Sequence, residues 1–129
     1  MKNNNRVAEW VYKAEEDYEV AHVFVRKRGR GAPDSVCFHA QQCAEKYIKG
    51  FLVSLGIPFP KIHDLYQLIN LVIRQEPLLL ELRNDLLVLN PFSVRFRYPG
   101  DRATKEDARE AFQAAKRIRT TFRIRLGLK

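Results

Sequence analysis

The chain has 129 residues, 46% of them hydrophobic, and a formal net charge of +8. This length and apolar content predict one domain, residues 1–129, with a single hydrophobic core. The N-terminus lacks the pattern of a secretion leader, and no apolar run approaches the ~20 residues that cross a bilayer, so we expect a cytoplasmic protein with no membrane segment.

Residues 7–25 carry apolar side chains at helical spacing and predict the first helix. Its apolar face consists of Val7, Trp10, Val11, Ala14, Tyr18, Ala21 and Val25. Asp17 falls on the flank of this face, where an unpaired carboxylate is costly to bury. We therefore expect an Arg, Lys or hydroxyl partner for Asp17 from a neighbouring helix. The glycines and the proline in residues 26–33 then predict a basic loop.

Residues 34–55 predict the second helix, which Asp34 or Ser35 can cap and which a glycine and a proline end. Its core face consists of Cys37, Ala40, Ala44, Ile48, Phe51 and Leu55. Cys37 and Cys43 point to different faces of this helix, so a disulfide between them is not expected and both thiols suit a reducing compartment.

A polar face is predicted on the opposite side of the second helix. It consists of His39, Gln42, Lys46 and Lys49. These side chains form either a cationic ligand surface or the solvated outer face of a bundle, and flanking apolar residues would also suit a dimer or partner surface.

Two shorter helices follow. His63 or Asp64 can begin a third helix that ends near Ile73, and Pro77 suits the first turn of a fourth. The fourth places four leucines at helical spacing, Leu79, Leu82, Leu86 and Leu89.

Residues 90–101 have no helical period and are bounded by prolines, so they predict an irregular loop. Within it, Arg95, Phe96, Arg97 and Tyr98 alternate cation and ring. An extended backbone would send the arginines to one side, where they suit phosphates, and the rings to the other, where they suit bases. The alternative is that both rings anchor the loop in the core while the arginines pair with acids such as Asp17.

The final helix is predicted over residues 104–126, because Thr104 and Asp107 match a capping box. Its apolar face consists of Ala108, Ala111, Ala115, Ile118, Phe122 and Leu126. Residues 95–129 carry 11 Lys/Arg and 4 Asp/Glu, so this quarter of the chain holds +7 of the net charge of +8. Such an asymmetry favours a polyanionic partner, although a solvated helix face has the same composition. The predicted fold class is all-α, an up-and-down bundle of four to five helices.

The stretch from Phe38 to Lys49, Phe-His-Ala-Gln-Gln-Cys-Ala-Glu-Lys-Tyr-Ile-Lys, resembles the signature of the HEPN domain family. Three further segments agree in order: the series Trp10, Ala14, Asp17 and Ala21; Lys61 to Leu65; and Arg97-Tyr98-Pro99 before an alanine-rich helix. The chain departs from the family pattern at Ile62, where a small hydroxyl residue is frequent, and at Gly100, where an acid is common.

This resemblance implies a bundle of four or five helices that forms a homodimer and has a small nucleotidyltransferase as partner in a toxin–antitoxin pair. Many members of the family are metal-independent RNases with an arginine followed after four to six residues by a histidine. Arg83-Asn84 matches the start of that motif, but positions 88–90 are Val, Leu and Asn. RNA cleavage without a metal needs a group that exchanges protons near neutral pH, so Arg83 alone is a remnant of the motif.

Two functions from different classes follow. The first is a nucleotide- or RNA-binding module, with Arg95, Arg97, Tyr98, His39 and Lys46 as candidate binding residues. The second is a divergent RNase that uses an arginine with an acid or base other than histidine. A third possibility is a dimeric scaffold that docks an acidic protein. No Cys/His spacing typical of zinc and no P-loop is present in the sequence, so neither a metal nor a cofactor is expected.

Overall fold

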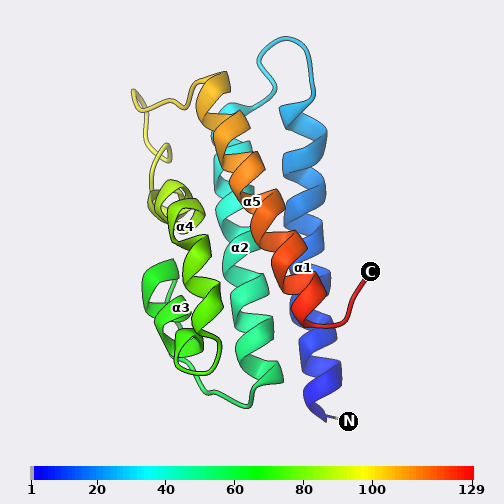
Figure 1. Ribbon diagram of the computed structural model, residues 1–129. Helices are drawn as coiled ribbons and strands as arrows, with labels where there is room; N and C mark the ends of the chain where they lie inside the picture. Colours follow the sequence, from blue (N-terminus) through cyan, green and yellow to red (C-terminus); the bar gives the residue numbers. More distant parts are fainter. Residues whose placement is uncertain (1) are drawn as a thin grey trace.

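Apolar side chains at helical spacing build three long helices and two short ones in the computed structural model, which describes residues 2–129. The α-helices are α1 (Lys2–Val25), α2 (Pro33–Ser54), α3 (Leu65–Ile73), α4 (Arg83–Leu89) and α5 (Lys105–Arg125). Two 3-10 helices, η1 (Pro77–Leu82) and η2 (Asn90–Ser93), flank α4. Figure 1 shows α1, α2 and α5 side by side, with α3 and α4 along the other side of α2. The described residues contain no strand, which confirms the all-α prediction.

The predicted apolar faces of α1 and α5 contribute in part to a core that α2, α3, η1 and α4 share. On α1, Ala14 and Ala21 are fully buried, and every predicted core position of α5 from Ala108 to Phe122 is buried. The capping box of α5 is confirmed: the Asp107 N–H donates to Thr104 Oγ1 at 3.0 Å, and the Thr104 N–H donates to Asp107 Oδ2 at 2.8 Å. These reciprocal bonds fix where α5 begins.

α2 is the central helix of the bundle, and the predicted solvated polar face on it is wrong at Lys49, which is only 6% exposed. α1 approaches α2 so closely that a Cβ added to Gly50 would lie 3.1 Å from Trp10 Cβ. Because α1, α3 and α5 surround α2, its polar side chains meet neighbours rather than bulk water. They consequently need partners within the protein.

The helix starts are only partly as predicted. Asp64 caps α3, since its side chain accepts the N–H groups of Tyr66 and Gln67. Neither Asp34 nor Ser35 caps α2: the N-cap is Ala32, in a left-handed conformation with φ 45°, and Pro33 occupies the first turn. Asp34 instead accepts the Ala103 N–H at 2.7 Å and joins the start of α2 to the segment before α5.

The leucine series after Pro77 is buried as predicted, although its first part is the 3-10 helix η1 rather than an α-helix. Cys37 and Cys43 are both buried and unpaired, and burial raises the pKa of the Cys37 thiol to about 12. Within residues 2–129, no helix has the length and apolar content needed to cross a membrane.

Candidate functional site

The arginines of α5 are largely neutralised within the protein. Arg117 pairs with Asp85 of α4 at 2.8 Å, Arg119 with Glu15 of α1 at 2.7 Å, and Arg125 with Glu76 at 3.1 Å. Most arginines of the last helix therefore form ion pairs that connect α5 to neighbouring parts of the bundle. The arginines of α5 are therefore not the main source of positive charge for a ligand.

Glu15 is the centre of the largest of these networks. It accepts two hydrogen bonds from Arg119, at 2.7 and 2.8 Å, and one from the Tyr47 hydroxyl. Burial opposes ionisation of Glu15, but the hydrogen bonds from Arg119 and Tyr47 outweigh it and hold the pKa of this carboxyl below its ordinary value. The ionised Glu15 thus ties α1 to α2 and α5 at once.

The expected partner of Asp17 is Lys46. Lys46 Nζ lies 2.6 Å from Asp17 Oδ2, and His39 Nδ1 lies 2.7 Å from Asp17 Oδ1. Two of the predicted binding residues are thereby brought together, but both face a carboxylate of the protein that is 9% exposed. They are positioned to neutralise Asp17 between α1 and α2.

A second buried carboxylate lies further along α2. Glu45 pairs with Lys49 at 2.9 Å and with His63 Nδ1 at 2.9 Å, while Gln41 donates to it at 3.2 Å. Since Gln41 also donates to the His63 backbone carbonyl, this group anchors the loop before α3 to α2. The polar positions of the HEPN-like stretch thus have structural partners in the bundle.

The alternation of Arg95, Phe96, Arg97 and Tyr98 does not place both rings on one side. Phe96 has φ 66°, which turns the chain, and its ring is 8% exposed, whereas Tyr98 is 77% exposed. The core-anchor alternative is therefore confirmed for Phe96 and wrong for Tyr98, and stacking on a base stays a prediction for the exposed Tyr98. The Arg97 guanidinium lies 5.8 Å from the Phe38 ring and donates to the Ser93 carbonyl at 3.2 Å, so it does not pair with Asp17.

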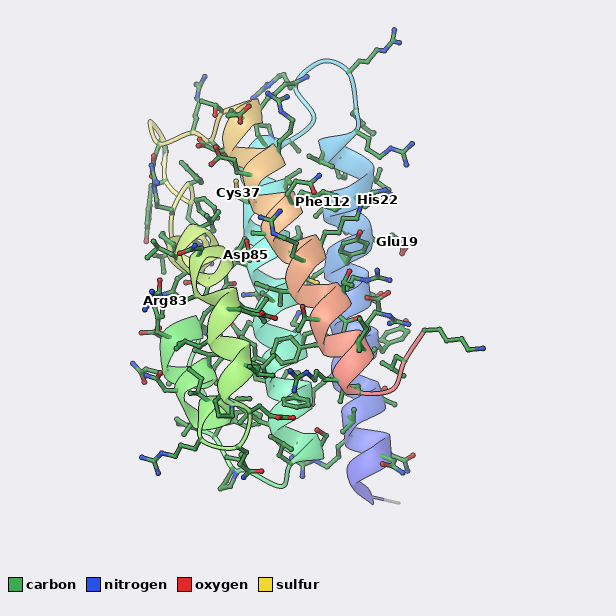
Figure 2. All side chains as sticks on the ribbon, in the orientation of Figure 1. Glu19, His22, Cys37, Arg83, Asp85 and Phe112 are labelled. Carbon is green, nitrogen blue, oxygen red and sulfur yellow. The ribbon has the colours of Figure 1, made fainter. Side chains whose placement is uncertain are left out.

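Arg83, the remnant of the RNase motif, lies at the start of α4. Figure 2 shows its side chain on the outer side of α4, away from the bundle, and Asp85 accepts the guanidinium of Arg117 from α5. Among the side chains that the structure describes, no three His, Cys, Asp or Glu residues gather as metal ligands would.

Several cations without an acidic partner lie on the segments at one end of the bundle, where the loop between α1 and α2 meets the segment that leads into α5 (Figure 1). Within the described part of the chain, no carboxylate lies within 4.0 Å of their charged groups. We call this group the basic end: Arg28, Arg30, Arg95, Arg97, Arg102 and Lys105. The sequence predicts the basic loop at residues 26–33, but it gives no indication that Arg102 and Lys105 lie beside this loop.

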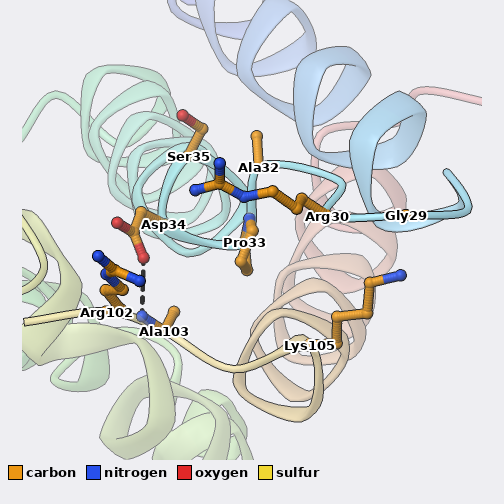
Figure 3. Close-up of a pocket in the computed structure, with 9 residues that line it drawn as sticks. All are labelled: Gly29, Arg30, Ala32, Pro33, Asp34, Ser35, Arg102, Ala103 and Lys105. Atoms are coloured by element: carbon orange, nitrogen blue, oxygen red, sulfur yellow. Dashed lines mark hydrogen bonds between the residues drawn. The ribbon is translucent and has the colours of Figure 1, made fainter.

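A cleft of about 670 Å³ opens in the basic end at the first turn of α2. Figure 3 shows Arg30, Arg102 and Lys105 around it, with Asp34 held by the Ala103 N–H. No side chain caps this turn of α2, so its first N–H groups and the positive end of the helix dipole add to the charge of the three cations. The arrangement suits a phosphate or a carboxylate.

The sequence profile of the HEPN domain matches residues 7–125, nearly the whole chain. The protein therefore belongs to the HEPN domain family, as the resemblance in α1, α2 and the later segments predicts.

Two relatives agree with this assignment. The chain is 32% identical to "Putative toxin MJ1304" of Methanocaldococcus jannaschii, over 84% of this chain and 80% of that protein. The crystal structure of ST0689, an archaeal HEPN homologue, superposes with a TM-score of 0.73 at 26% identity, covering 92% of this chain and 96% of that one. The similarity thus extends along the whole bundle.

Proposed function

We propose that the protein is a toxin-like HEPN module that binds RNA or a nucleotide through the basic end. The observation that carries the proposal is that the arginines of α5 pair with acids, whereas no carboxylate among the described residues lies within 4.0 Å of the charged groups of the basic end. The name of the M. jannaschii relative, a putative toxin, supports the toxin-like setting.

Binding rather than cleavage is proposed because Arg83 has no histidine partner after it on α4. Purified protein in a chelator should leave single-stranded and structured RNA intact. Reproducible cleavage that is lost in Arg83→Ala would favour a divergent RNase instead.

The binding proposal predicts a steep dependence on salt. Each phosphate neutralised on a single strand releases condensed counterion, so log affinity should fall against log salt with a slope of about −0.7 per contact. Fluorescence anisotropy with a labelled single-stranded RNA at several salt concentrations measures this slope. Arg97→Ala should weaken binding and flatten the slope by somewhat under one unit.

Two variants complete this experiment. Tyr98→Ala should weaken binding by ~1–3 kcal/mol with an unchanged slope if the exposed ring stacks on a base. Arg74→Ala removes an exposed arginine outside the basic end and is the matched control, which should bind as the unaltered protein does. A salt-independent affinity, or equal losses in Arg97→Ala and Arg74→Ala, would contradict the proposal.

We also propose that the module acts as a homodimer beside a nucleotidyltransferase partner. Apolar side chains exposed along η1, α4 and the turn after η2 offer a dimer surface: Leu78, Leu80, Leu87 and Val94. Light scattering coupled to size-exclusion chromatography should give twice the mass of 15.1 kDa, and Leu87→Glu should give a monomer. Co-purification with a nucleotidyltransferase encoded by an adjacent gene tests the partner, and a monomeric mass would refute the dimer.

A further inference from the structure

Resting on the proposed RNA or nucleotide binding, we infer that the cleft at the first turn of α2 is a subsite for a phosphomonoester. The chemical class is the terminal phosphate of an RNA strand or of a nucleotide, in contrast to the internal diesters that the rest of the basic end would contact. The charge of the cleft and the donors around it favour the terminal phosphate, and its one carboxylate has a separate structural partner.

The charge of the cleft matches a doubly ionised group. Its lining contains three cations, Arg30, Arg102 and Lys105, and one carboxylate, Asp34. The balance is therefore close to +2, whereas a phosphomonoester carries about −1.5 to −2 at pH 7 and a diester carries one negative charge. A terminal phosphate would neutralise the cleft.

The carboxylate in the cleft already has a partner. Asp34 Oδ1 accepts the Ala103 N–H at 2.7 Å and holds the two walls of the cleft together. Asp34 thus has a structural function that accounts for an acid in a site for an anion. The three cations of the cleft have no carboxylate within 4.0 Å among the described residues.

Donors with fixed directions are also present. α2 has 22 residues and no side-chain cap, and α5 begins at Lys105 on the same side of the cleft. The uncapped N-terminus of α2 therefore points its positive end toward the cleft, whereas the start of α5 is bonded in its own capping box. Guanidinium forks from Arg30 and Arg102 can bind the oxygens of a phosphate in pairs, which a terminal group permits because three of its oxygens are unsubstituted.

The remainder of a strand has a path from the cleft. Arg102 belongs to the same loop as Arg97 and the exposed Tyr98, which are the residues proposed to contact a phosphate and a base. A strand whose terminal phosphate occupies the cleft can follow this loop outward. A mononucleotide would bind in the cleft only and would not extend along this loop.

The experiment compares two RNA oligonucleotides of one sequence, one with a 5′-phosphate and one with a 5′-hydroxyl, both labelled at the 3′ end. At fixed salt and pH 7.5 the phosphorylated strand should bind the full chain about tenfold more tightly. In the double variant Arg30→Gln, Arg102→Gln this ratio should fall to about one. Arg74→Gln, the control outside the cleft, should keep the tenfold ratio.

A second measurement distinguishes the source of the phosphate. Titration calorimetry with adenosine 5′-monophosphate, and with adenosine as its control, tests the mononucleotide directly. Binding of the monophosphate that is lost in Arg102→Gln, together with no RNA binding, would uphold the subsite and overturn the RNA part of the proposed function.

The remaining outcomes are also distinct. Equal affinity for the two oligonucleotides, or a ratio that survives in the double variant, would overturn the subsite while leaving RNA binding in place. No binding of either strand or of the monophosphate would overturn both. Since Arg30 and Arg102 are exposed, an unchanged thermal midpoint in the variants verifies that they fold.

Discussion

Replacing Glu15 with glutamine should weaken the connection between α1 and α5. The change keeps the shape of the side chain, but it removes the negative charge and replaces one of the two oxygens that accept hydrogen bonds from Arg119 and Tyr47. Hydrogen bonds to charged groups contribute about 1.5–3 kcal/mol. The Glu15 side chain is 33% exposed, so solvent screening places the expected loss at the lower end, ~1–2 kcal/mol.

The loss should depend on pH in a defined direction. The pKa of Glu15 is lower in the folded protein than in the unfolded chain, so its ionised form stabilises the fold above its ordinary pKa of 4.5. That contribution disappears as the pH falls through the folded pKa. The difference in unfolding free energy between the unaltered protein and Glu15→Gln should be largest near pH 7 and should shrink below pH 4.5.

Urea unfolding followed by circular dichroism between pH 3.5 and 7 measures this difference. At pH 7 the thermal midpoint of Glu15→Gln should fall by about 3–8 °C for a domain of this size. The control is Glu19→Gln, an exposed carboxylate on the same helix, which should change stability by less than ~0.5 kcal/mol. Equal stability of the two variants at pH 7, or a loss in Glu15→Gln that persists undiminished at pH 3.5, would refute the reasoning.

Three further predictions concern packing and thiol access. Ala44→Phe should overpack the contact around the fully buried Ala44 and lower the free energy of unfolding by ~1–3 kcal/mol, as measured by thermal unfolding. The control Ala8→Phe, at an exposed site on α1, should lower it by less than ~0.5 kcal/mol. Phe96→Ala should destabilise the domain by about 3 kcal/mol, whereas Tyr98→Ala should leave its stability unchanged, because only the Phe96 ring is buried. Equal midpoints of urea unfolding for the two variants would contradict this difference in burial. The Cys37 thiol, with its pKa raised to about 12 by burial, should not react with iodoacetamide at pH 8 in the folded state, and rapid alkylation detected by mass spectrometry would contradict its burial.

The regular parts of this fold are predictable because they depend on local chemistry. Spacing of apolar residues predicts α1, α2 and α5, and the caps at Asp64 and Thr104 are confirmed because each side chain bonds to backbone within three residues. Local rules are insufficient at Ala32 and Phe96. Both have positive φ without being glycine, a conformation that their residue types disfavour and that apolar periodicity does not reveal.

The candidate site is less predictable because it depends on distant pairing. The excess of arginine in the last quarter of the chain is plain in the sequence, but the acids that neutralise it, Glu15, Glu76 and Asp85, lie far earlier. The cations that remain available to an anionic ligand can be identified only when those ion pairs are known. The same holds for the cleft, since Asp34 and Ala103 are 69 residues apart.

The link between Glu15 and Arg119 spans 104 residues, which gives it a consequence for synthesis of the chain. α1 and α2 can pair as a local hairpin soon after they leave the ribosome, but the face that receives α5 stays uncovered until the last helix has been made. During that interval Tyr47 and Glu15 of the nascent hairpin can bond to each other, but Glu15 has not yet met Arg119 and the apolar face beside it is exposed. Completion of the C-terminal helix is consequently the step that closes the core and ends this vulnerable stage.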